Sequence, residues 1–99
     1  ETDAILCNND DLALGALFEC QRRGIRVPDQ MGICGFNDLE MMAAANPPIT
    51  SVRTFRLAMG RDAFRMLTGA LAGIEPEQPV VDLGYEVVAR GSTARNGQG

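Results

Sequence analysis

The sequence contains no histidine and no tryptophan, and tyrosine occurs only once. The lack of histidine removes the side chain that most often serves as a general base or a metal ligand. The three cysteines, Cys7, Cys20 and Cys34, are too widely spaced for a CxxC or zinc-binding pattern, so we expect reduced thiols in the core. The sequence therefore predicts no metal site and no cofactor.

Positive charge is also scarce, since 9 Lys and Arg residues stand against 13 Asp and Glu residues and give a formal net charge of −4. This balance argues against direct binding of the segment to a phosphate backbone. No apolar run approaches the roughly 20 residues of a membrane span, and no signal peptide is visible. We therefore expect a cytoplasmic protein without a membrane partner.

The length of 99 residues and the hydrophobic fraction of 45% suit one small domain or part of a larger one. Because the chain begins at Glu1 and reaches the apolar residues 4–7 almost at once, we expect a fragment that lacks its N-terminal part. We assign residues 1–95 to this partial domain and residues 96–99 to a disordered tail.

The first third of the chain has the pattern of a βαβ unit. Residues 4–7 are predicted to be a short, fully buried strand, residues 31–36 a second buried strand, and residues 12–23 a helix that ends at Gly24. Two strands joined by a helix in this way lie parallel and adjacent in an α/β fold. The further predicted elements are a helical turn at 41–45, a strand at 51–54, a helix at 55–72, strands at 80–83 and 85–90, and a frayed tail at 92–99.

Polar side chains follow both strands of the βαβ unit: Asn8 and Asn9 after the first, Asn37 and Asp38 after the second. The carboxyl ends of parallel strands share one edge of the sheet, which is where open α/β folds bind ligands. Side chains of this kind can bind the hydroxyl groups of a sugar or sugar acid. Helix capping and turn formation explain the same residues, and neither interpretation excludes the other.

Two further interpretations concern charged residues. Arg53, near the end of a strand, is either an anion clamp or a solvated arginine that bonds loop carbonyls. Paired carboxylates for acid–base catalysis could come from Asp10, Asp11, Asp38 and Glu40, but no nucleophile elbow, P-loop or GxGxxG motif accompanies them. We therefore expect no catalytic residues and no enzyme.

Five segments between residues 4 and 94 resemble, in order, the C-terminal part of the lactose/galactose repressor family: CNNDDLALGAL, RVPDQMGICGFNDLE, NPPITSVRT, MGRDAFRML and ARGST. The CNND segment resembles the gluconate-repressor branch. The resemblance implies a type I periplasmic-binding-protein-like fold, with a mostly parallel sheet flanked by helices. This chain would be most of the C-terminal subdomain, and the helix-turn-helix domain that binds operator DNA would lie upstream.

The resemblance also implies a small carbohydrate or sugar-acid effector, held in the cleft between two subdomains. The matching effector positions are Asn9, Asn37 and Thr54, with Asn8, Asp38 and Arg53 as lesser candidates. Asn37 departs from the family, which usually has an aspartate there. An amide donates hydrogen bonds as well as accepting them, so an anionic sugar acid becomes easier to bind.

The family forms homodimers through this subdomain, and the resemblance places Leu14 and Ala45 at the interface, with Leu17 and Phe18 beside them. Apolar residues on more than one face of the predicted helix agree with this. We therefore predict the effector-sensing and dimerisation part of a transcriptional repressor. The alternatives are a periplasmic sugar-binding protein of a transport system, which the scattered thiols disfavour, and a small α/β enzyme, which lacks a catalytic constellation.

Overall fold

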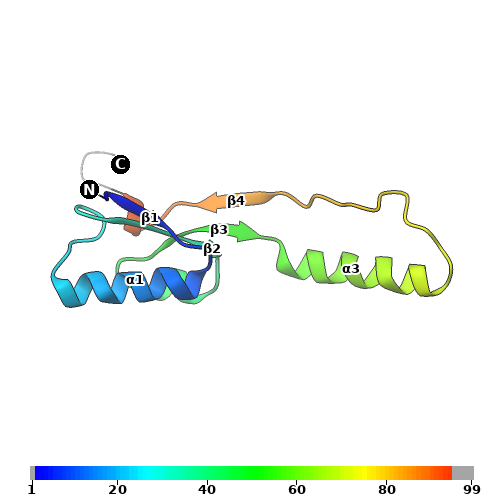
Figure 1. The fold of residues 1–99 in the computed structure, drawn as a ribbon, viewed down its shortest axis with the longest axis horizontal. Helices are drawn as coiled ribbons and strands as arrows, with labels where there is room; N and C mark the ends of the chain where they lie inside the picture. Colours follow the sequence, from blue (N-terminus) through cyan, green and yellow to red (C-terminus); the bar gives the residue numbers. More distant parts are fainter. Residues whose placement is uncertain (1, 95–99) are drawn as a thin grey trace. The chain divides into compact units, whose positions relative to one another are not determined.

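A computed structural model describes residues 2–94, which form two compact units (Figure 1). The first unit comprises residues 2–54 and 86–94, and the second comprises residues 55–85. The tail predicted at residues 96–99 lies outside the described part of the chain.

The first unit is a sheet with helices connecting its strands. Its elements are β1 (Ala4–Leu6), α1 (Asp10–Arg23), β2 (Gly32–Asn37), α2 (Met41–Ala44), β3 (Thr50–Thr54), β4 (Tyr85–Val88, whose first residue belongs to the second unit) and the 3₁₀ helix η1 (Gly91–Thr93). The strand order is β1-β2-β3-β4. Strands β1, β2 and β3 are parallel, with Leu6 opposite Cys34 and Phe36 opposite Val52, whereas the arrow of β4 points the other way (Figure 1). The predicted βαβ unit and α/β class are confirmed.

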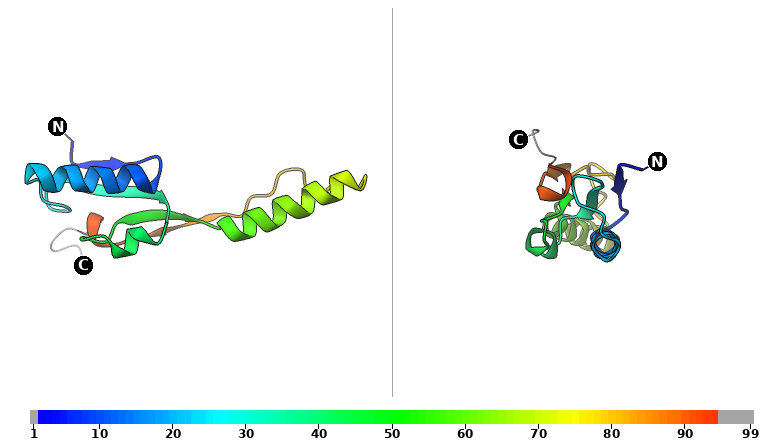
Figure 2. Two further views of the ribbon diagram at one scale, coloured as in Figure 1. Left: turned by 90° about the horizontal axis from the view of Figure 1, so that it is seen from below. Right: turned by 90° about the vertical axis from the view of Figure 1, so that its left-hand side faces the viewer.

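The core lies on one face of this sheet, where α1 and α2 both pack (Figure 2). Its buried members from the helices and strands are Ala13, Leu17 and Cys20 of α1, Met42 of α2, Ile33 of β2, and Ile49 just before β3. No α-helix within residues 2–54 and 86–94 covers the opposite face. The prediction of a fully buried first strand is therefore wrong, since Leu6 is 73% exposed on that open face.

The ends of α1 follow from local chemistry. Asn9 is the N-cap, and its Oδ1 accepts a hydrogen bond from the backbone N–H of Leu12 at 2.9 Å. Gly24 ends the helix with φ 73°, a left-handed conformation that costs glycine little. The sequence predicts both ends to within two residues.

Two sequence predictions near the C-terminus are wrong. Residues 80–83 have the apolar composition of a strand but form none. Ser92, predicted to fray, is fully buried: its Oγ accepts a hydrogen bond from the N–H of Thr50 at 2.8 Å and donates one to the carbonyl of Ile33. The burial of Ser92 depends on partners distant in sequence, which a local pattern cannot show.

The second unit contains α3 (Arg56–Leu71), within one residue of its predicted range at each end. No residue of α3 is buried within the described chain, and its large apolar residues Phe64, Leu67 and Leu71 are exposed. In the described residues, no helix is both long and apolar enough to cross a membrane.

Candidate functional site

The polar residues predicted from the sequence lie where β1, β2 and β3 end. We call Asn8, Asn9, Asn37, Asp38 and Thr54 the polar edge. Because these strands are parallel, their carboxyl ends meet at one side of the sheet. The structure therefore places Asn8, Asn9, Asn37 and Asp38 at one edge of the sheet, as predicted, with Thr54 at the end of the next strand.

The two central asparagines of the polar edge use their side-chain oxygens within the protein. Oδ1 of Asn9 accepts from Leu12, and Oδ1 of Asn37 accepts from the hydroxyl of Thr54 at 3.4 Å. Within residues 2–94, neither side-chain NH₂ group makes a hydrogen bond. The edge therefore offers two amide donors to an incoming molecule, and hydrogen-bond acceptors such as carboxylate oxygens suit it best.

Asp38, a member of the polar edge, forms ion pairs with two arginines. Arg53 donates a hydrogen bond from Nε to Oδ2 of Asp38 at 2.8 Å, and Nη1 of Arg90 lies 2.7 Å from Oδ1. Arg53 also approaches Glu86, with 3.7 Å between Nη1 and Oε2. The guanidinium of Arg53 is thus shared between two carboxylates, while its side chain is still 45% exposed.

The same ion pairs set the ionisation of Asp38, whose side chain is 6% exposed. Burial alone would raise its pKa, but the contacts with Arg90 and Arg53 outweigh burial and hold the pKa below its usual value. A lowered folded-state pKa means that ionised Asp38 stabilises the fold above the pKa of the unfolded chain. That contribution is lost as the pH falls from the usual value of 3.8 through the folded-state pKa.

Replacing Asp38 by asparagine should therefore make the stability of the fold less dependent on pH in the acid range. We expect Asp38→Asn to lower the free energy of unfolding by about 2 kcal/mol at pH 7, and by less at pH 3. Denaturant unfolding of the full-length protein at both pH values measures this difference. Asp11→Asn, at an exposed carboxyl, is the control and should change stability by less than about 0.5 kcal/mol. An equal loss at both pH values in Asp38→Asn would contradict the assignment.

Three residues that support the polar edge are not apparent as such from the sequence: Asp10, Ser51 and Arg90. Asp10 is fully buried; its Oδ2 accepts from the N–H of Leu39 at 2.6 Å and its Oδ1 from the hydroxyl of Ser51 at 2.7 Å. The partners are separated by 29 and 41 residues, so only the fold brings them together. Gly35 is the sequence feature that could indicate the buried position of Asp10, since a glycine inside a strand indicates close approach of another group.

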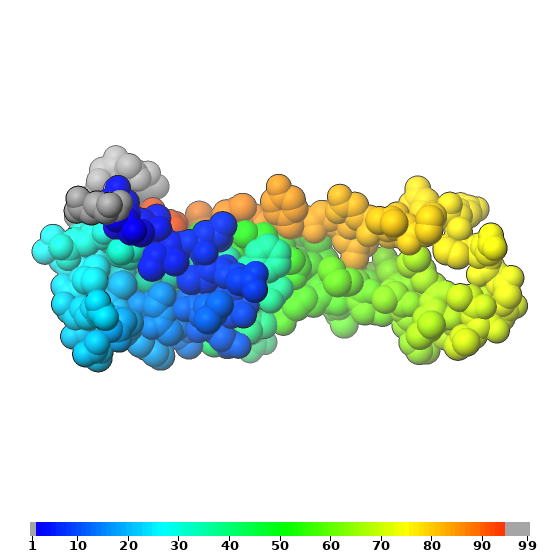
Figure 3. Space-filling model, in the orientation of Figure 1, coloured from blue at the N-terminus to red at the C-terminus, as the bar shows by residue number. Residues whose placement is uncertain are grey.

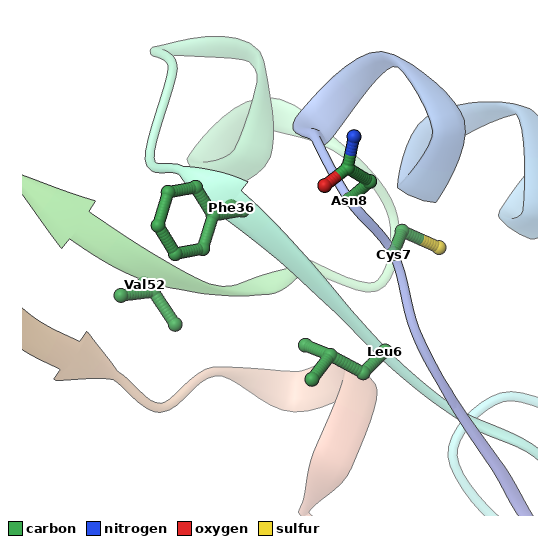
Figure 4. Close-up of a pocket in the computed structure, with 5 residues that line it drawn as sticks. All are labelled: Leu6, Cys7, Asn8, Phe36 and Val52. Carbon is green, nitrogen blue, oxygen red and sulfur yellow. The ribbon is translucent and has the colours of Figure 1, made fainter.

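A depression of about 420 Å³ lies beside the polar edge, lined by Leu6, Cys7, Asn8, Phe36 and Val52. Figure 4 shows Phe36 and Val52 on neighbouring strands, with the Cys7 sulfur turned away from them. The lining is mostly apolar and belongs to the open face of the sheet, and Asn8 is its only member from the polar edge. We therefore place the candidate ligand contacts at the polar edge and not in this depression.

The outer side of α1 forms the second candidate surface (Figure 3, blue). Leu14 and Phe18 are one helical turn apart, and Phe18 is largely exposed. The side chain of Gln21, on the same stripe, donates to the carbonyl of Asn46 at 2.9 Å, which brings the loop after Ala45 beside this stripe. We call Leu14, Phe18 and Ala45 the outer patch. Leu17 is 1% exposed and belongs to the core, so it has no surface for a partner chain.

The three cysteines are free thiols, with Cys7 and Cys20 buried, as the sequence predicts. Burial raises the pKa of the Cys7 and Cys34 thiols, which keeps them protonated and poorly nucleophilic. Within residues 2–94, no group of three or more Cys, Asp or Glu side chains has an arrangement that could hold a metal ion.

Comparison with known proteins shows the family. The model of the periplasmic binding protein-like domain matches residues 1–93. The transcriptional regulator GntR of Pseudomonas aeruginosa is 44% identical over 93 residues, which cover 94% of this chain and 27% of that protein. This chain thus spans about a quarter of the length of that curated relative.

Solved structures agree with this result. A LacI-type regulator of Bifidobacterium animalis has a TM-score of 0.85 at 38% identity, over 94% of this chain and 33% of that one. A LacI-family regulator of Arthrobacter in complex with lactose has a TM-score of 0.82 at 30% identity, over 95% of this chain and 36% of that one. The chain belongs to the periplasmic-binding-protein-like family, and within it to the LacI/GalR transcriptional regulators.

Proposed function

We propose that this chain is the effector-sensing and dimerisation part of a cytoplasmic transcriptional repressor. The polar edge supplies half of a site for a small ligand, and the other half comes from the rest of the full-length protein. Ligand binding shifts the population between DNA-competent and DNA-incompetent states. Operator DNA binds through a part of the protein outside this chain, in keeping with the net charge of −4.

The observation that carries the ligand proposal is the pair of amide donors at the edge. Asn9 and Asn37 each engage their oxygen internally and keep their NH₂ group for a ligand. A sugar acid has a carboxylate that accepts such bonds, together with hydroxyl groups that bind Thr54 and Asn8. The lactose complex of the Arthrobacter regulator supports a carbohydrate as the class of ligand.

Changing Asn37 to aspartate tests this ligand class. A carboxylate accepts hydrogen bonds but cannot donate them, and it repels the carboxylate of a sugar acid. We expect full-length Asn37→Asp to bind D-gluconate at least about tenfold more weakly in calorimetry. Asn46→Asp makes the same chemical change at an exposed residue away from the polar edge and should leave binding intact. Equal affinity in wild type and Asn37→Asp would contradict the proposal.

The dimerisation proposal depends on the outer patch. Phe18 is a large apolar side chain at the surface of α1, and Leu14 and Ala45 are partly covered by the core of their own chain. Exposed aromatic and aliphatic groups on one continuous surface are typical of the centre of a protein–protein interface. A second copy of the chain could bury this patch against its own α1 in a two-fold symmetric contact.

A further inference from the structure

The backbone where β2 leaves the sheet has a conformation that needs support. Asn37 and Asp38 have φ values of 109° and 58°, two consecutive non-glycine residues in the left-handed region. L-residues adopt such values only when their surroundings hold them there. The direction of the Asn37 side chain at the polar edge therefore depends on what anchors the residues that follow it.

The anchor is the carboxyl group of Asp10. It accepts the N–H of Leu39 at 2.6 Å and the hydroxyl of Ser51 at 2.7 Å, and Oγ of Ser51 accepts the N–H of Asp38 at 3.0 Å. Two successive backbone N–H groups of the loop are thus held, one directly by Asp10 and one through Ser51. All the side-chain atoms that do this are buried.

Asp10 also follows Asn9 directly and begins α1. Asn9 is itself fixed by its capping bond to Leu12. Asn9, one of the two amides proposed to face the ligand, is therefore joined directly to Asp10. Asp10 in turn anchors the loop that follows the second amide, Asn37. The two amides follow different strands, so this connection adds to the pairing of β1 with β2 in holding their separation.

We infer that Asp10 is a positioning residue of the effector site, which fixes Asn9 and Asn37 at the spacing that a ligand requires. The inference builds on the proposed function. Asp10 itself is fully buried and does not touch the ligand. Ser51 has the same role in part, as the bridge to the backbone of Asp38.

Variants of the full-length protein separate positioning from general stability. Asp10→Ala removes both acceptors, whereas Asp10→Asn keeps one carbonyl oxygen for the N–H of Leu39. Asp11→Ala is the matched control for loss of a carboxyl in the same helical turn, at an exposed residue. Ser92→Ala is the control for stability, because Ser92 is buried and hydrogen-bonded near the opposite ends of β2 and β3.

Calorimetry with D-gluconate and hydrogen exchange of the backbone amides without ligand give two independent readouts. We expect Asp10→Ala to weaken binding about tenfold or more and to speed exchange at Asp38 and Leu39, with Asp10→Asn intermediate. Asp11→Ala should match wild type, and Ser92→Ala should lower Tm without changing affinity. If Asp10→Ala does not fold, the intermediate loss in Asp10→Asn is decisive.

Wild-type affinity in Asp10→Ala and Asp10→Asn, or unchanged exchange at Leu39, would overturn the inference. So would an equal loss of affinity in Ser92→Ala, since that would show a general effect of stability. If wild-type protein does not bind D-gluconate, the proposed function fails at its ligand. The exchange readout then still decides whether Asp10 holds the loop.

Discussion

Replacing Gly35 by alanine is expected to destabilise the protein by about 3 kcal/mol and to abolish ligand binding. A Cβ at this position would overlap Oδ1 of Asp10 and would lie 3.2 Å from Cβ of Ala13. The new methyl group must displace either the carboxyl that anchors the loop or the first turn of α1. Chemical denaturation and calorimetry of the full-length variant measure the two effects.

Gly15→Ala is the matched control, because a Cβ at Gly15 meets nothing within 4 Å. Gly15 lies on the exposed side of α1, where alanine favours the helix over glycine by up to about 1 kcal/mol. We expect this variant to be as stable as wild type or more so, with unchanged affinity. Equal stability of Gly35→Ala and wild type would mean that Asp10 does not occupy the space beside β2.

The second large effect is expected at Leu14. An arginine there would place a charge in the centre of the outer patch, and burying an unpaired charge is strongly unfavourable. We expect Leu14→Arg to leave a monomer at concentrations where wild type is a dimer, with a dimer dissociation constant at least about 100-fold higher. Sedimentation of the full-length protein measures it.

Leu12→Arg is the control for this change, since Leu12 is also exposed on α1. It is two residues away, about 200° around the helix from Leu14, so it faces a different direction. This variant should remain a dimer. A Leu14→Arg variant that stays dimeric would show that the outer patch is not the interface.

The elements that depend on local chemistry were predictable from the sequence. The N-cap at Asn9 and the left-handed end at Gly24 each follow from a few neighbouring residues. The parallel pairing of the first two strands follows from the order strand, helix, strand. The positions of Asn8, Asn9, Asn37 and Asp38 at one edge then follow from the topology alone. This is why much of the candidate site could be located without coordinates.

The features that could not be predicted from the sequence depend on contacts between residues far apart in the chain. The resemblance places Leu17 beside the interface, but Leu17 packs into the core because of the way α1 lies on the sheet. Arg90 reaches Asp38 across 52 residues, and Asp10 reaches Ser51 across 41. Such long-range polar contacts have no periodicity, so a sequence can indicate at most the glycine that makes room for them.

The most direct test of the proposed ligand class is calorimetric titration of the full-length wild-type protein with D-gluconate and with D-glucose. The two ligands differ at one end, where the acid has a carboxylate that accepts hydrogen bonds and the sugar does not. With amide donors of Asn9 and Asn37 at the polar edge, we predict that the acid binds at least about tenfold more tightly. Equal or tighter binding of the neutral sugar would contradict this account.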